Sequence, residues 1–349
     1  MTNTDNTVLT LIRIAVSGKT ENLQKKIDWA EVIEKASIQG VLGLCFDAID
    51  LLSNEHRPDI NNLMKWLGQV NYMETCYEEH KKAIINLARF YDKQGIKMML
   101  LKGYGLSLYW PKSNHRPVGD IDSYNFGLHS FADKMISDKL NIKIDNSHHK
   151  HSVFSFMGVT VENHYSFLNT HGHRSTADID KILFEEINEI ADPDILNLYY
   201  PSVKFNSLYL LRHSAEHFAS VDLNLRQVLD WGFFVQKNNI DWNWLLSVLG
   251  KVGMKDYFAV LNAICIKHLG FDSSLFPALD INNALVDRSL NDILKPEVER
   301  EHHSNLISEV GFRFKRWWKN SWKHDMVYRE SKWQSLLTQV WSHILKPSL

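Results

Sequence analysis

Leu101-Lys102-Gly103 and, after a short apolar run, Arg116-Pro117-Val118-Gly119-Asp120-Ile121-Asp122 decide the fold and the chemistry expected of this chain. Asp120 and Asp122 are separated by one residue in an expected strand, so their side chains point to the same side. Carboxylates arranged in this way can share hard, oxygen-seeking cations. A third acid, Glu162, lies in another alternating run, Val159-Thr160-Val161-Glu162-Asn163-His164. Together these acids predict a metal-dependent phosphoryl or nucleotidyl transfer site.

The composition is that of an ordinary globular protein. With 349 residues, 44% hydrophobic and 23% charged, the chain can bury a large core, and its length allows two or three domains. Its 39 basic and 41 acidic residues nearly balance, so overall charge gives no strong nucleic-acid signal. Cys45, Cys76 and Cys265 lack metal-like spacing and are typical of reduced thiols. We expect a cytoplasmic protein without a signal peptide or a transmembrane segment.

Hydrophobic periodicity divides the chain into three parts. Helical spacing dominates residues 1–95, where a long helix is expected from about Met73 to Gln94 with Gly95 as its cap. Residues 96–200 combine short strands with helices, including a hairpin that turns at Met157-Gly158. Residues 201–349 are again helical. The expected fold class is therefore α+β, with a small mixed β-sheet core flanked by N-terminal and C-terminal helical regions.

These residues resemble the nucleotidyltransferase superfamily that shares the polymerase-beta-like catalytic core. More specifically, the chain resembles a family of poorly characterised bacterial nucleotidyltransferases. The motif of that family reads approximately leucine-lysine-glycine, then arginine-proline-x-glycine-aspartate-isoleucine-aspartate. Val161-Glu162-Asn163-His164 occupies the third-acid position, and the resemblance extends over most of the chain. It departs from the broader superfamily at Tyr104, where glycine or serine usually follows the glycine.

The resemblance implies an enzyme that transfers a nucleoside monophosphate from a nucleoside triphosphate, such as ATP, to an unidentified acceptor. Asp120, Asp122 and Glu162 would be the catalytic and metal-binding residues, with Mg²⁺ as the ion and Mn²⁺ as its alternative. Such ions neutralise the charge on the phosphorus-bound oxygens and orient an in-line nucleophile. Glu162 would complete a metal site or accept a proton from the attacking hydroxyl.

Lys102, Gly103 and Arg116 are the candidate nucleotide-binding residues. Gly103 would allow the backbone to approach the triphosphate closely, because glycine has no side chain, and a following helix would present free amides. Lys102 and Arg116 are candidate phosphate partners. As alternatives, Lys102 is a charge at the end of a strand, and Arg116 braces the loop before the acidic strand.

Further candidates lie around this motif as substrate-contacting or supporting residues. His164 should share a strand face with Glu162, where a contact with the acids or substrate and a structural role are both open. His213 and His217 are four residues apart and should share one helical face, but the glutamate between them is misplaced for a zinc-protease motif. Arg226 is four residues before Asp230, so an intrahelical ion pair is the favoured interpretation, and a place in the acceptor cleft is its alternative.

A basic, aromatic segment lies near the C-terminus, Arg313-Phe314-Lys315-Arg316-Trp317-Trp318-Lys319, followed by Trp322 and Lys323. A terminal helix packed on its own domain is favoured over contact with a membrane or nucleic acid. The expected partners are therefore a nucleoside triphosphate and an unknown acceptor. The alternative function is a noncatalytic nucleotide-binding or protein-interaction module with the same fold.

Overall fold

The computed structural model describes residues 1–23, 26–170, 173–220, 223–298 and 315–335. Its N-terminal part consists of α1 (Asn3–Ser17), α2 (Trp29–Ile38), α3 (Leu42–Asp47), the 3₁₀ turns η1 (Ile49–Leu51) and η2 (Asn54–His56), and α4 (Ile60–Asp92). Side-chain caps fix several helix starts, because Thr2, Asp28 and Asp59 accept hydrogen bonds from the first free amides of α1, α2 and α4.

The long helix α4 differs from its prediction at its N-terminal end. It begins at Ile60, well before Met73, because Asp59 caps it and the helix continues through a largely polar first half. Only Trp66 and Val70 are buried there, so apolar periodicity gave little signal. The other end agrees with the prediction, since the helix stops at Asp92 and Gly95 adopts a left-handed conformation with a φ of 70°.

One mixed sheet of six strands follows, as predicted for the fold class. Its strands are β1 (Met98–Leu100), β2 (Ile121–Tyr124), β3 (His151–Phe156), β4 (Val159–His164), β5 (Glu189–Ala191) and β6 (Leu198–Pro201). Their order is β3-β4-β2-β1-β6-β5. The pairs β2–β4 and β1–β6 are parallel, and the remaining neighbours are antiparallel.

The predicted hairpin is confirmed. Met157 and Gly158 both have positive φ angles, 52° and 81°, which is the backbone of a two-residue hairpin turn that matches the twist of the strands. Shorter elements connect the other strands, namely α5 (Tyr104–Ser107), η3 (Ser113–His115), α6 (His129–Leu140) and α7 (Arg174–Glu185). The helix expected after Gly103 is thus only the short α5.

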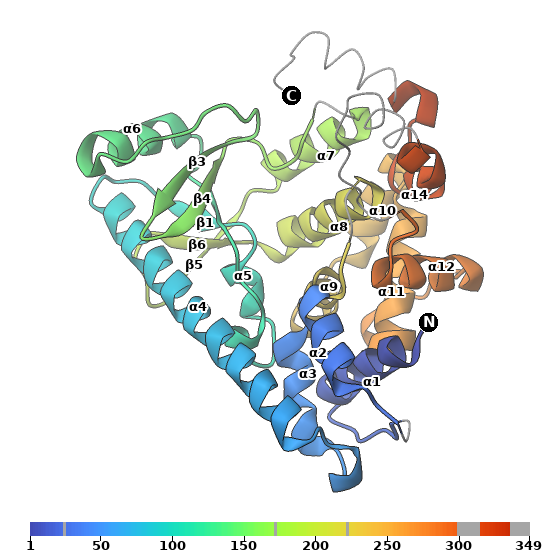
Figure 1. Cartoon of the computed structure of the whole chain (residues 1–349). Coiled ribbons are helices and arrows are strands. Elements are labelled where there is room, and N and C mark those ends of the chain that lie inside the picture. Colours follow the sequence, from blue (N-terminus) through green and yellow to red (C-terminus); the bar gives the residue numbers. More distant parts are fainter. Residues whose placement is uncertain (24–25, 171–172, 221–222, 299–314, 336–349) are drawn as a thin grey trace.

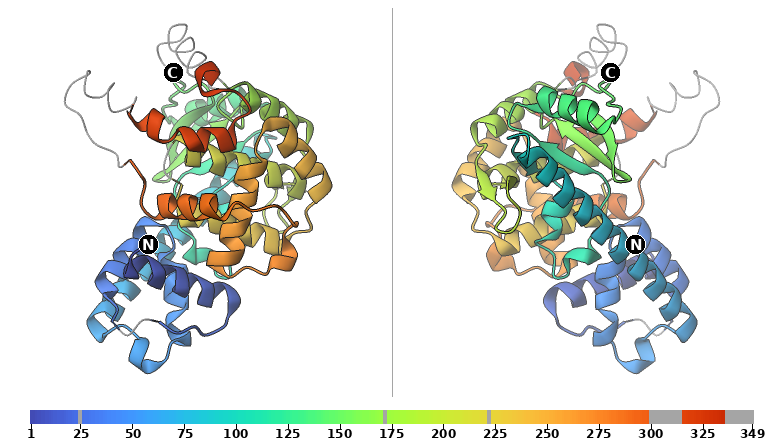
Figure 2. Two further views of the ribbon diagram at one scale, coloured as in Figure 1. Left: turned by 90° about the vertical axis from the view of Figure 1, so that its right-hand side faces the viewer. Right: turned by 90° about the vertical axis from the view of Figure 1, so that its left-hand side faces the viewer.

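The C-terminal part is helical, as expected. Its fully described elements are α8 (Val203–Ser220), α9 (Leu225–Lys237), α10 (Trp242–Val252), α11 (Lys255–Leu269), η4 (Ser273–Leu275), α12 (Asn283–Leu294) and α14 (Ser321–Val327). Figure 1 shows α8 leading from the sheet toward these helices, and Figure 2 shows α1–α3 gathered at one end of the molecule. In the described part of the chain, no helix has the length and apolarity needed to cross a membrane.

The sheet separates two apolar cores. Met98 and Leu100 of β1 pack into a core that includes Leu87 of α4 and Ile136 of α6. Met99 faces the opposite way, into the larger core shared with α8, as expected when successive side chains of a strand alternate. In Figure 1, α4 runs along one side of the sheet, with α8 on the other. The same large core joins α1 to α11, so N-terminal and C-terminal helices are packed together.

Helix α9 depends on a glycine where it meets the segment after α11. A Cβ at Gly232 would lie 2.4 Å from two ring atoms of the buried Phe271. Gly232→Ala is therefore expected to destabilise the protein by about 1–3 kcal/mol through overpacking, measured as a lower urea midpoint.

Gly68→Ala is the matched control for this substitution. Gly68 lies in α4, and nothing comes within 4 Å of its Cβ position. Alanine should stabilise an exposed helical position by up to about 1 kcal/mol relative to glycine. Equal effects of the two substitutions would contradict the packing described for α9.

Candidate active site

The sheet register brings the predicted acids together. Asp122 of β2 lies directly opposite Glu162 of the parallel strand β4, so both side chains project from the same face. Asp120 immediately precedes β2, where its backbone carbonyl accepts a hydrogen bond of 3.2 Å from His80 Nε2. One carboxylate oxygen from each of the three acids lies within 4.8 Å of the other two.

Asp122 is the buried centre of this cluster. Its Oδ1 is 2.7 Å from Lys102 Nζ and 2.9 Å from His164 Nε2. Burial alone would raise the pKa of Asp122, but the charge of Lys102 and the hydrogen bond from His164 outweigh it and hold that pKa well below its usual range. Burial likewise opposes the charge of Lys102, yet Asp122 raises the pKa of this lysine.

The other two acids have different environments. Burial and the negative charge of Asp122 raise the pKa of Asp120. Glu162 is also penalised by burial, but its hydrogen bond with His164 lowers its pKa overall. Mutual repulsion therefore falls mainly on Asp120, and a bound cation would favour the ionised form of all three acids.

Helix α8 carries the predicted histidine pair, and both rings lie near the charge of Lys102. The rings of His213 and His217 are 4.6 Å apart, as their spacing predicted. Burial, followed by the nearby charge of Lys102, lowers the pKa of both, to about 4 for His217. Both rings are consequently neutral at pH 7, a state suited to hydrogen bonding.

Lys150 is a basic residue of the site that the sequence did not single out. It directly precedes β3, and burial followed by the charge of Lys102 lowers its pKa, while Asp122 and Glu162 oppose that shift. Lys150 therefore belongs to the electrostatic environment of the acids. Its position in a polar run, Ser147-His148-His149-Lys150, is typical of a surface loop and carried no signal of this placement.

Arg116 has a different environment from that expected of a phosphate ligand. Its Nε and Nη2 donate to the two carboxylate oxygens of buried Asp230, at 2.7 and 2.8 Å, and Trp110 Nε1 donates to the same carboxylate at 2.9 Å. Arg116 thus braces the loop before β2 against α9, which is the alternative considered from sequence. The arrangement gives no support to a direct phosphate contact.

The predicted ion pair between Arg226 and Asp230 is wrong, because Asp230 pairs with Arg116 instead. The bidentate guanidinium of Arg116, together with Trp110, already occupies the Asp230 carboxylate. The aliphatic stem of Arg226 instead packs against Gly40, and its Nε has no hydrogen-bond partner among the described residues. Burial and the charge of Arg116 lower the pKa of Arg226.

Gly103 forms the tight turn expected before the short helix α5. Its φ of 57° lies in the region that favours glycine, and an added Cβ would be 3.3 Å from the backbone oxygen of Asp120. This close approach brings the segment that carries Lys102 beside the segment that carries Asp120. The glycine therefore has a structural reason that is independent of nucleotide binding.

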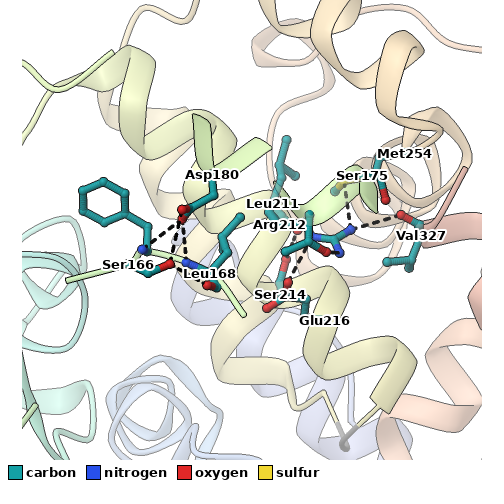
Figure 3. Close-up of polar contacts among 12 residues, drawn as sticks. Ser166, Leu168, Ser175, Asp180, Leu211, Arg212, Ser214, Glu216, Met254 and Val327 are labelled. Carbon is teal, nitrogen blue, oxygen red and sulfur yellow. Dashed lines mark hydrogen bonds and ion pairs between the residues drawn. The ribbon is translucent and has the colours of Figure 1, made fainter. Parts of the chain in front are cut away.

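A further set of hydrogen bonds fixes the position of His164. Its Nδ1 donates to the backbone oxygen of Ser166 at 3.2 Å. Asp180 of α7 fixes that loop by accepting from the amides of Phe167 and Leu168, at 3.0 and 2.9 Å, and from Ser166 Oγ. Figure 3 shows these contacts converging on Asp180. Sequence reasoning missed Asp180 because its partners are two backbone amides and a serine that are distant from it in sequence.

Arg212 links α8 to the C-terminal part of the chain. It donates to Glu216 and to the backbone oxygen of Val327, at 3.1 and 3.2 Å, and also contacts Thr176. Its guanidinium lies 4.6 Å from the ring centroid of Tyr328. Figure 3 shows Arg212 beside Glu216 and Val327, and the contacts with Thr176 and Val327 tie α8 to α7 and to the end of α14.

The basic aromatic segment is only partly described, since Arg313 and Phe314 lie outside the described residues. Lys323 is buried and forms a 2.5 Å ion pair with Asp292 of α12. The Trp322 ring lies 5.5 Å from that of Phe218. These two residues pack on their own domain, as the favoured interpretation predicted.

Comparison with known proteins adds one finding. The model of a family described as uncharacterised nucleotidyltransferase matches residues 25–270, a region that includes the sheet, the acids, and α8 and α9. No curated protein and no solved structure matches the chain.

Proposed function

The chain belongs to the uncharacterised nucleotidyltransferase family, and on this premise we propose that it transfers a nucleoside monophosphate from a nucleoside triphosphate to an acceptor in a metal-dependent reaction. The observation that carries the proposal is the clustering of Asp120, Asp122 and Glu162, whose oxygens lie within 4.8 Å of one another. Catalysis of phosphoryl and nucleotidyl transfer relies mainly on positioning and on charge stabilisation, and this cluster is suited to both.

The donor chemistry fits Mg²⁺, with Mn²⁺ as the alternative. Asp120, Asp122 and Glu162 offer the carboxylate oxygens that hard divalent ions prefer. When bound there, such an ion would supply charge neutralisation at the reacting phosphate. The raised pKa of Asp120, caused by burial and then by Asp122, supports a site whose full ionisation needs a compensating cation.

Basic side chains near the acids are proposed to bind the triphosphate. Lys102 is held 2.7 Å from Asp122, where it can bind the triphosphate while it maintains the orientation of that acid. Lys150 supplies a second positive charge near the same acids. We do not retain Arg116 as a phosphate ligand, because Asp230 engages its guanidinium. Glu162 would accept the proton of the attacking acceptor group as the bond to pyrophosphate breaks.

Glu162→Gln tests whether Glu162 acts in the transfer step and the basic residues act in nucleotide binding. We expect the substitution to lower the rate of transfer more than the affinity for nucleotide, because binding should depend largely on phosphate and base contacts. The measurement is turnover of an α-³²P-labelled triphosphate beside equilibrium binding of the same nucleotide. Glu185→Gln, at an exposed residue of α7, is the control. Parallel losses of affinity and turnover, with no additional catalytic defect, would argue against the proposed role.

The identity of the acceptor can be approached directly. The purified protein, Mg²⁺ and a panel of α-labelled triphosphates are incubated with cell extract, and the molecule that acquires the label is isolated. Nucleotide binding without transfer or pyrophosphate release would instead favour the noncatalytic module.

A further inference from the structure

We propose that His151, His164 and Glu162 form a binding site for a first-row transition-metal ion, distinct in its ligands from the all-carboxylate cluster. His151 lies on β3, directly opposite His164 on β4, and Glu162 lies two residues before His164. The three side chains therefore project from one face of the sheet. Glu162 belongs to both ligand sets, so the inference deepens the proposed function and rests on it for its catalytic meaning.

The donor atoms have the spacing of ligands around one ion. Nδ1 of His151 is 3.1 Å from Oε2 of Glu162, and Nε2 of His164 is 3.3 Å from the same oxygen. All three donors lie within 4.8 Å of one another. Adjacent ligands at about 2.1 Å from a tetrahedral ion are about 3.4 Å apart, close to both of the shorter separations.

The orientation of His164 is that of a metal-binding imidazole. A carbonyl oxygen can only accept, so Nδ1 carries the hydrogen in its 3.2 Å contact with Ser166. Nε2 donates to Asp122 in the metal-free protein, and a bound ion would displace that hydrogen and take the lone pair of Nε2. Metal-binding histidines commonly donate their other ring nitrogen to a carbonyl in this way. Asp180 fixes the position of Ser166 in turn, as Figure 3 shows.

The environment of His151 is an independent indication of a metal site. Only 7% of this residue is exposed, and its Nδ1 has no hydrogen-bond partner within the part of the chain that the structure describes. The nitrogen nevertheless lies 3.1 Å from the Glu162 carboxylate. The ring is held in place by His148, 4.1 Å away and nearly parallel, and by His164 at 5.0 Å. Buried polar atoms rarely lack a partner, and a bound ion would satisfy this one.

The ligand types select the ion. Two imidazoles and one carboxylate favour ions such as Zn²⁺, Co²⁺ or Fe²⁺ over Mg²⁺, which prefers oxygen ligands. Asp122 stays outside the proposed set, because Lys102 Nζ lies 2.7 Å from its Oδ1. The transition-metal ion should therefore bind beside the carboxylate cluster and should resist displacement by Mg²⁺.

The test uses Co²⁺ as the probe on the full-length protein after treatment with a chelator. We expect one equivalent to bind with visible d–d absorption bands that persist in millimolar Mg²⁺ and disappear on addition of Zn²⁺. His151→Ala should weaken Co²⁺ binding by at least about 10-fold. His56→Ala, at a histidine whose side chain contacts Ser53 in the N-terminal part, is the control and should bind Co²⁺ like the parent.

Pulsed EPR of the Co²⁺-loaded parent protein in millimolar Mg²⁺ gives a readout that depends on no variant. Coupling to imidazole nitrogen supports the site, whereas oxygen ligation alone would overturn it. Unchanged Co²⁺ affinity in folded His151→Ala would also overturn it. Because neither readout needs turnover, nitrogen ligation without nucleotidyl transfer would count against the proposed function alone, and transfer with oxygen ligation alone against this inference alone.

Discussion

Asp120→Asn and Asp122→Asn, made separately, are each expected to lower kcat/KM for metal-dependent nucleotidyl transfer by more than about 100-fold. Each substitution removes a negative charge and a strong cation ligand without creating a cavity. The measurement is the initial rate of pyrophosphate release at saturating Mg²⁺. Asp138→Asn, on the exposed surface of α6, should behave like the parent protein.

The two substitutions differ in their expected effect on folding. Asp122 is buried against Lys102 at 2.7 Å, so its neutralisation leaves a lysine without its ion-pair partner and should also reduce stability. Asp120 is only partly buried, and its raised pKa indicates that its charge is costly in the metal-free protein. Asp120→Asn should therefore keep the fold intact. Near-normal turnover of both folded variants would defeat the catalytic assignment.

The second large effect is expected on stability. Arg116→Met should lower the free energy of unfolding by about 3–5 kcal/mol, because it leaves the buried Asp230 carboxylate without its bidentate partner. The change should be visible as a lower urea midpoint. Trp110 would retain its single hydrogen bond to Asp230, which is too little to balance a buried charge.

A double variant separates the effect of losing the Arg116–Asp230 ion pair from the effect of losing the packing of the Arg116 side chain. Adding Asp230→Asn to Arg116→Met removes the unpaired charge and should recover part of the stability. Lys181→Met is the control, because its ion pair with Glu185 is exposed on both sides and should contribute little. An effect of Arg116→Met as small as that of the control would contradict the bracing role.

Local sequence patterns predicted the elements that carry the acids. The alternation of apolar and polar residues around Met157-Gly158 predicted the β3–β4 hairpin. In the structure these two residues have positive φ angles and form the two-residue turn. Lys102 was considered as a charge at the end of a strand, and β1 ends two residues before it. By contrast, β5 and β6 are short, and β6 joins the sheet through a parallel contact with β1 that is distant in sequence, so local pattern did not reveal them.

Side-chain partners were harder to predict than elements. Asp230 has an arginine one helical turn before it, yet it pairs with Arg116, which is 114 residues away in sequence. That choice depends on how the loop before β2 packs against α9, which spacing alone does not encode. Lys150 and Asp180 were missed for the same reason. The acids were predicted because strand alternation and the family motif both pointed to them.

The most direct test of the central claim is the fate of the α-phosphate. The protein is incubated with Mg²⁺, cell extract and triphosphate labelled with ³²P at either the α or the γ position. We expect the α label to move to an acceptor while the γ label leaves as pyrophosphate, and Asp120→Asn to abolish both. Transfer of the γ label, or α-label transfer that is unchanged in folded Asp120→Asn, would contradict the central claim.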